Sequence, residues 1–152
     1  ECKIRYEKVM ENGMQKKVTE PYLVDALSFT EAEARIIEEM TPFISGEFTV
    51  SDIKRANYSE LFPSDEESAD RWFKCKLIFI TLDEKSGAEK KTSTQVLVQA
   101  ADLRDAVKKL DEGMKGTMAD YQIGMVSETP LMDVYPYSAE PNDKPEFDPS
   151  KA

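Results

Sequence analysis

The alternation of hydrophobic and polar side chains at the start of the chain recurs about 73 residues further on. Within Cys2–Tyr6 every second side chain is apolar and the two between them are basic, which is the pattern of a strand with one buried face. Residues Cys75–Phe79 occupy the matching positions of the second half and begin with the same Cys-Lys pair. Two strands of one kind are therefore predicted, one in each half.

The match between the halves extends beyond these strands. Lys16-Lys17 falls on Lys90-Lys91 at a shift of 74, so the second half carries one extra residue in its turn. Further matches at that shift are Leu23-Val24 with Leu97-Val98, Ala26 with Ala100, Ala32 with Ala106, Glu38 with Glu112 and Met40 with Met114. Because an internal repeat marks the folding unit, we expect a tandem duplication whose copies are related by a pseudo-twofold axis.

The first copy reads strand, turn, strand, helix, strand. Asn12-Gly13 is a strong hairpin signal, and the return strand is expected through 22–26. Ser28 and Glu31 have the spacing of a capping box, which opens a helix. A third strand is expected over 48–53. The apolar stripe of the helix is predicted to be Phe29, Ala32, Ile36, Ile37 and Met40.

The second copy repeats this order. Strands are expected over 72–82 and 94–100, around a turn at Ser86-Gly87, and a helix begins after the capping residue Asp102. Its core face is predicted to be Leu103, Ala106, Val107, Leu110 and Met114. A last strand and a short edge piece are expected over 121–125 and 131–135.

These elements predict an α+β fold, a tandem duplication of a ββαβ unit with antiparallel strands and both helices packed on one side. A half of about 70 residues has only a marginal core by itself, so we expect one compact domain. In it, a first repeat at 1–63 and a second at 72–136 are joined by an acidic linker at 64–71. Residues 137–152 are acidic, rich in proline and poor in apolar residues, and are expected to be disordered.

Composition limits the classes of function. No apolar run approaches the roughly 18 residues of a membrane helix, and 33% of the residues are charged, so a soluble, cytoplasmic protein is expected. Histidine is absent, which removes the commonest general base and the usual triads. No phosphate loop or metal-ligand spacing is present, so we expect a non-enzymatic protein without cofactor or metal. Cys2 and Cys75 are expected to be buried, reduced thiols.

The net charge of −10 conceals an uneven distribution of basic residues. On the predicted strands they alternate with the apolar set, so they are expected to share one sheet face. Trp72 is in phase with Lys74 and Lys76, which makes it a candidate for an exposed stacking residue. Basic and aromatic side chains on a sheet bind single-stranded nucleic acid in this way. The predicted binding residues are Lys3, Arg5, Lys74, Lys76, Lys90, Lys91 and Trp72.

Several alternatives remain open at this point. Lysines and arginines on a half-exposed sheet also serve solubility and discourage edge aggregation. The rival function is a protein-interaction adaptor or acidic inhibitor, which would present Glu31, Glu33, Glu38, Glu39 and the tail to a basic partner. An enzyme with carboxylate-held magnesium is a third class, although nothing in the sequence pairs two carboxylates. Homodimerisation through strand edges is also compatible with the pattern.

The runs Cys2–Lys8 and Thr19–Ala34 resemble an uncharacterised family of roughly this length from gut bacteria and their phages. The resemblance extends from Cys2 to about Tyr135. It implies no known activity, ligand or catalytic residue, and suggests only a phage or mobile-element setting. The working interpretation is therefore a non-enzymatic binding module, an accessory single-stranded nucleic-acid-binding protein of a phage or mobile element.

Overall fold

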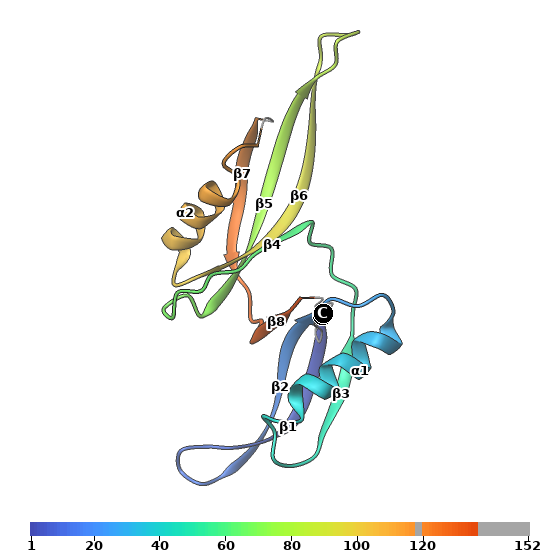
Figure 1. The fold of residues 1–152 in the computed structure, drawn as a ribbon, viewed down its shortest axis with the longest axis vertical. Coiled ribbons are helices and arrows are strands. Elements are labelled where there is room, and N and C mark those ends of the chain that lie inside the picture. Colours follow the sequence, from blue (N-terminus) through green and yellow to red (C-terminus); the bar gives the residue numbers. More distant parts are fainter. Residues whose placement is uncertain (118–119, 137–152) are drawn as a thin grey trace, which may run out of the picture. The chain divides into compact units, whose positions relative to one another are not determined.

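The chain folds into two compact units, each with one four-stranded sheet and one helix (Figure 1). The computed structural model describes residues 1–117 and 120–136. Unit 1 contains Glu1–Arg55 and the segment that begins at Leu131, and unit 2 contains Ala56–Pro130. Within the described ranges, neither helix combines the length and the apolar character that a membrane crossing requires.

Unit 1 is made of β1 (Cys2–Val9), β2 (Gln15–Val24), α1 (Phe29–Met40), β3 (Phe48–Ile53) and β8 (Asp133–Tyr135). Its sheet has the order β3-β1-β2-β8. The first three strands pair antiparallel, whereas β8 joins β2 in parallel. Cys2 and Ile4 of β1 are buried and Tyr6 is half-buried, whereas Lys3 and Arg5 between them are exposed, as the sequence pattern predicts. The sheet is thus mixed rather than purely antiparallel.

The core of unit 1 lies between the sheet and α1. The Ser28 hydroxyl accepts a hydrogen bond from the Glu31 backbone N–H at 3.1 Å, which caps the helix as the capping-box spacing predicts. Helix α1 then buries Ala32, Ile36 and Met40. These side chains form one cluster with Cys2 and Ile4.

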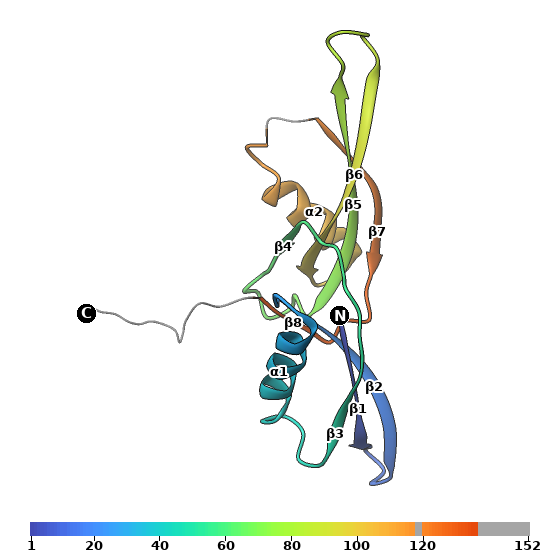
Figure 2. The ribbon, with the colours of Figure 1, turned by 90° about the vertical axis from the view of Figure 1, so that its right-hand side faces the viewer.

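Unit 2 is made of β4 (Glu60–Phe62), β5 (Arg71–Leu82), β6 (Glu89–Ala100), α2 (Leu103–Gly113) and β7 (Tyr121–Glu128). Its sheet has the order β4-β6-β5-β7. Strand β7 pairs antiparallel with β5, and β4 pairs in parallel with β6. Because β5 and β6 are longer than their outer neighbours, they form a hairpin that extends past β7 (Figure 2).

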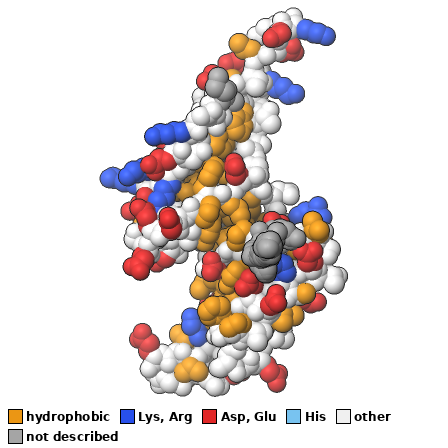
Figure 3. All heavy atoms as spheres, in the orientation of Figure 1, with side chains coloured by type: hydrophobic (Ala, Val, Ile, Leu, Met, Phe, Trp, Pro, Cys, Tyr) orange, Lys and Arg blue, Asp and Glu red, His pale blue; other side chains and the backbone are white. Residues whose placement is uncertain are grey.

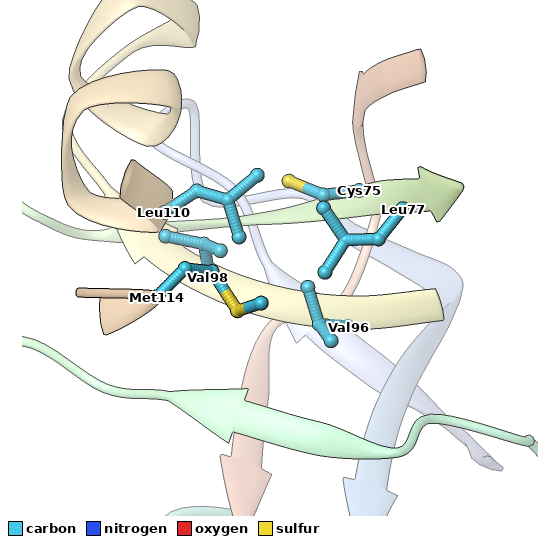
Figure 4. Close-up of a cluster of buried hydrophobic side chains, with 6 residues drawn as sticks. All are labelled: Cys75, Leu77, Val96, Val98, Leu110 and Met114. Carbon is cyan, nitrogen blue, oxygen red and sulfur yellow. The ribbon is translucent and has the colours of Figure 1, made fainter. Parts of the chain in front are cut away.

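The core of unit 2 repeats that of unit 1. Leu110 and Met114, from α2 and its C-cap, lie over side chains from the middle of β5 and β6 (Figure 4). The side chains of this cluster are Cys75, Leu77, Val96, Val98, Leu110 and Met114. Both cysteines are buried and free, which confirms the expectation of buried, reduced thiols. Burial raises the pKa of the Cys75 thiol to about 11, so its reactive thiolate form is disfavoured.

Irregularities of the two sheets fall at corresponding positions. The hairpin turns contain Gly13 and Gly87, both with positive φ, at a shift of 74, where glycine avoids the strain of a side chain. A β-bulge interrupts the pairing of β1 with β3 between Lys3 and Ile4. The corresponding bulge, at a shift of 73, lies between Lys76 and Leu77. The two units therefore share bends and turns as well as strand order.

The short edge strands are exchanged between the two halves of the sequence. Strand β4 follows β3 along the chain but pairs with β6 of unit 2, at 96–98. Strand β8 follows β7 but pairs with β2 of unit 1, at 22–24. The boundaries of the expected repeats, 1–63 and 72–136, put residues 60–62 in the first repeat and residues 133–135 in the second. The compact units divide the chain differently, at Arg55 and Pro130.

The structure confirms the α+β class and corrects parts of the predicted helix faces. Phe29 is 57% exposed and Ile37 42% exposed, although both were assigned to the stripe of α1; Leu103 of α2 is 51% exposed. Phe29 and Leu103 are the first residues of their helices, and the buried residues of each helix begin three positions later, at Ala32 and Ala106. The segment 64–71 was expected to be a solvated linker, but Ala69 in it is buried. The predicted tail, 137–152, lies outside the described residues.

Candidate functional site

Four of the predicted binding residues, Lys3 and Arg5 of β1 and Lys74 and Lys76 of β5, lie on the sheet face opposite the helix, which we call the open face of each unit. Lys3 and Arg5 alternate with the buried residues of β1, and Lys74 and Lys76 alternate with those of β5. The phase predicted from the sequence is therefore correct. The prediction of one shared sheet face is wrong, because β1 and β5 belong to different sheets.

The adjacent pair Lys90-Lys91 is divided between the two faces of β6. Lys91 lies opposite Ile80, in the phase of Lys74 and Lys76, whereas Lys90 lies opposite Thr81 on the helix side. Directly opposite residues of an antiparallel pair project to the same face. Of this pair, only Lys91 therefore lies on the open face of unit 2, together with Lys74 and Lys76. In unit 1 the corresponding lysine, Lys17, lies opposite Glu7.

Trp72 does not act as an exposed stacking residue. It is in phase with Lys74, as expected, but its side chain is only 5% exposed. Leu97, which lies directly opposite Lys74 and two residues from Gln99, the cross-strand partner of Trp72, is 0% exposed. The open face is thus buried where β5 begins, Lys74 is half-buried, and Lys76 is exposed. The alternation along a strand predicts on which face of the sheet a side chain lies, but not whether other residues bury it.

The open face of unit 2 carries three lysines without an acidic residue directly opposite any of them. Lys74 lies between Leu97 and Ser127, and Lys76 between Gln95 and Met125. The register brings two carboxylates to the hairpin end of this face: Glu89, opposite Leu82, and Asp120, whose carbonyl accepts from the Ile80 N–H. The part of the face around Lys74 and Lys76 is therefore positive and uncompensated.

Apolar and amide side chains fill the rest of this open face. Ile78 and Ile80 are half-buried, Leu82 is 69% exposed and Met125 is 39% exposed. Gly124, the extra residue of the bulge, lies so close to Ile78 that a Cβ there would come within 2.9 Å of its Cδ1. Phe79 and Tyr121 pack on the helix side, and Trp72, in the phase of the open face, is buried. Bases would therefore meet aliphatic side chains rather than rings.

The open face of unit 1 differs in its charge balance. Lys3 lies opposite Asp52 and Lys17 opposite Glu7, while Arg5 lies between two threonines. A hollow of about 630 Å³ beside Arg5 and Lys17 is also lined by Glu7 and Glu47. The lysines of this face thus have carboxylates in direct register. An anionic ligand would gain less there than on unit 2.

Ion pairs in the described part of the chain do not involve the open-face lysines. Lys109 of α2 contacts Glu66 at 2.5 Å and Asp105 at 3.0 Å, and its Nζ donates to the Ser64 hydroxyl. Burial lowers the pKa of Lys109, but the hydrogen bonds to the two carboxylates outweigh it and raise the pKa overall. These contacts hold segment 64–66 against α2, so this lysine has a structural role.

Metal binding finds no support in the described residues, which contain no group of three or more potential ligands. The four glutamates of α1 are spread around the helix: Glu33 and Glu38 are exposed, and Glu31 and Glu39 are half-buried.

Sequence reasoning missed the apolar part of the site. Ile78 and Ile80 continue the phase of Lys74 and Lys76, so extending that alternation along β5 would have found them. Met125 and Gln95 were not accessible in this way, because they reach the face only through strand register and the bulge. Lys17 enters the sequence analysis only as the match of Lys91, not among the predicted binding residues.

Comparison with known proteins gives a family without an assigned activity. The family model described as "Domain of unknown function (DUF4494)" matches residues 1–137. No curated protein and no solved structure matches the chain.

Proposed function

Since the chain belongs to the DUF4494 family, a domain of unknown function, we propose a function from its own surfaces: a non-enzymatic module that binds single-stranded nucleic acid on the open face of unit 2. Lys74, Lys76 and Lys91 contact phosphates there. Ile78, Ile80 and Met125 support the bases.

One observation carries this proposal, namely that residues directly opposite these lysines are never acidic in unit 2. The corresponding lysines of unit 1 face carboxylates. A carboxylate directly opposite a lysine neutralises the charge that a phosphate would otherwise neutralise. A lysine without such a carboxylate can bind a phosphate, and the counterions released on binding favour the complex. The net charge of −10 opposes polyanion binding as a whole, so affinity depends on where the lysines are.

The proposed setting is the cytoplasm, where buried thiols such as Cys2 and Cys75 stay reduced. A phage or mobile-element origin is part of the proposal only through the sequence resemblance. No step of chemistry is assigned to the protein.

The experiment compares two double variants of equal charge. Lys76→Gln with Lys91→Gln neutralises the face of unit 2, and Lys3→Gln with Lys17→Gln neutralises the corresponding positions of unit 1. Binding of a short labelled single-stranded oligonucleotide is followed by anisotropy at low salt. Fluorescence of the buried Trp72 and circular dichroism serve as folding controls.

We expect the unit 2 variant to bind roughly tenfold or more weakly, and its salt dependence to fall by about 0.7 log units per lost phosphate contact. The unit 1 variant should change affinity less than about threefold, because its lysines are already offset. Equal losses in both variants would mean that only total charge matters and would overturn the proposal. Equally tight binding of inorganic polyphosphate would show a polyanion site that does not use bases.

A further inference from the structure

Helix α1 and the residues beside its two ends expose four large apolar side chains to solvent. Leu27 is 90% exposed, Phe29 57%, Ile37 42% and Phe43 77%. Leu27 immediately precedes the N-cap Ser28, and Phe43 follows the end of the helix. A hydrophobic residue before the N-cap often packs back on the helix, but the exposure of Leu27 shows that this contact is not made.

The other unit provides an internal comparison for these positions. At a shift of 74 the counterparts are Ala101, Leu103, Asp111 and Thr117. The alignment holds structurally, because the Phe43 N–H donates to the Met40 carbonyl and the Thr117 N–H to the Met114 carbonyl. Three of the four positions are therefore small or polar in unit 2.

The buried face of the helix, in contrast, is shared. Ala32, Ile36 and Met40 of unit 1 correspond to Ala106, Leu110 and Met114, and all six are buried. The fold therefore constrains the buried positions but not the exposed ones. Unit 2 has the same buried face without apolar residues at the positions of Leu27, Ile37 and Phe43, whose exposure carries the cost of contact with water.

Acidic residues accompany this apolar surface. Phe29, Glu33 and Ile37 follow one another at a spacing of four, so they form one row along α1. Glu38 is adjacent to Ile37, and both Glu38 and Glu39 lie in the last turn, which contains no basic residue. Carboxylates at that end oppose the helix macrodipole, and a cation nearby would relieve the opposition. Over α1, Figure 3 shows orange and red side chains interspersed.

We propose that the surface formed by Leu27, Phe29, Ile37, Phe43 and Glu33 docks a basic amphipathic helix of a partner protein. Apolar side chains of the partner pack on the row of α1, and a lysine or arginine between them pairs with Glu33. Helix α1 spans about 18 Å, so a partner helix of about 12 residues matches it. This surface is distinct from the open face of unit 2 and does not depend on nucleic-acid binding.

Charge complementarity selects this occupant. A second copy of the chain would bring another α1 with Glu33 and Glu38 against the first, which like charges disfavour. The chain's own residues 137–152 carry four acidic and two basic residues, so they too lack the complementary charge. A basic amphipathic helix satisfies both the apolar row and the carboxylates.

The test uses designed peptides of defined composition. One is a helical peptide of leucine and lysine with apolar residues spaced three and four apart, and its control has glutamate in place of lysine. The protein variant carries Leu27→Ala, Ile37→Asp and Phe43→Thr, which transplants the residues of unit 2 onto unit 1. Circular dichroism and Trp72 fluorescence verify its folding.

We expect the lysine peptide to bind the native chain and to lose at least tenfold in affinity with the transplanted variant, while the glutamate peptide does not bind. The variant is more acidic than the native chain, so non-specific attraction of a cationic peptide would persist or increase. Unchanged or tighter binding would therefore overturn the proposal. Self-association of the native chain in sedimentation that the variant abolishes would also overturn it, in favour of a second copy as occupant.

A charge variant separates the two parts of the surface. Glu33→Gln leaves the apolar row intact and removes the central carboxylate. We expect it to weaken the lysine peptide about three- to tenfold and to reduce the salt dependence of its binding. Binding unaffected by this substitution would show that the carboxylate does not select the partner.

Discussion

The two units fold alike but present different surfaces. Their sheets have corresponding strand orders, their helices begin at capping residues 74 positions apart, and their bulges coincide. Open-face lysines, however, face carboxylates in unit 1 and neutral residues in unit 2. In and beside α1, Leu27, Ile37 and Phe43 are apolar where unit 2 has Ala101, Asp111 and Thr117. Positions that agree are those the fold needs, and positions that differ are available for binding.

A second difference lies inside the units. On the helix side of unit 1, the hydroxyls of Tyr6 and Tyr22 donate to Glu20 at 2.8 and 3.3 Å. The corresponding residues in unit 2 are Phe79, Val96 and Thr94, which offer no such network. The same strand positions therefore hold a hydrogen-bonded polar group in unit 1 and mostly apolar side chains in unit 2.

The largest expected effect comes from the shared core. Ile36→Ala and Leu110→Ala remove corresponding side chains that are both 0% exposed. Each should destabilise the chain by about 2–5 kcal/mol, through lost burial and a residual cavity. Urea unfolding followed by circular dichroism measures both, and Trp72 fluorescence reports unit 2. A cost below about 1 kcal/mol for either variant would contradict the claim that the two cores are equivalent.

An intermediate effect is expected where the cores differ. A Cβ on Gly113 would lie 2.8 Å from two ring atoms of Phe62, so Gly113→Ala should destabilise by about 1–3 kcal/mol. Alanine favours a helix by up to about 1 kcal/mol over glycine, but a rigid ring cannot yield as a flexible chain can. Thermal unfolding measures the change. The matched control is Glu39→Ala at the corresponding site of α1, with an expected change within about 0.5 kcal/mol.

A double-mutant cycle sharpens this prediction. If the ring causes the strain, Gly113→Ala should cost little in a Phe62→Leu background. A cost that persists there would assign the effect to the backbone of α2 instead.

Sequence reasoning reached the order of the elements other than β4, the capping residues, the third strand of the first repeat and the side of β1 and β5 on which Lys3, Arg5, Lys74 and Lys76 lie. These features depend on local pattern and spacing. The exchange of β4 and β8, the burial of Trp72 and the separate sheets depend on which distant segments meet. Phe29 and Ile37, which are exposed, could not be placed from the sequence for a similar reason. An apolar stripe indicates a helix but does not say how much of the stripe the sheet covers.

The smallest expected effect concerns alkaline pH. Burial and then the hydrogen bond to Glu20 raise the pKa of Tyr6 to about 12, and burial with nearby Asp133 raises that of Tyr135 to about 12. Since the unfolded value is 10, the folded state holds these protons longer. The resulting stability is complete below pH 10 and is lost as the pH rises towards 12.

Tyr6→Phe gives unit 1 the residue found at Phe79 and should weaken this pH dependence. Urea midpoints at several pH values between neutral and alkaline measure it, with Phe79→Tyr as the reciprocal change. An alkaline loss of stability as steep in Tyr6→Phe as in the native chain would show that the tyrosine network is not its source.

The most direct test of the difference between the units is a map of backbone amide shifts by NMR during titration with a single-stranded oligonucleotide. We expect the largest changes at Lys74, Lys76, Gln95 and Met125, with little change at Lys3, Arg5 and Lys17. Changes of equal size on both open faces, or on that of unit 1 alone, would contradict the account that opposing carboxylates decide which face binds.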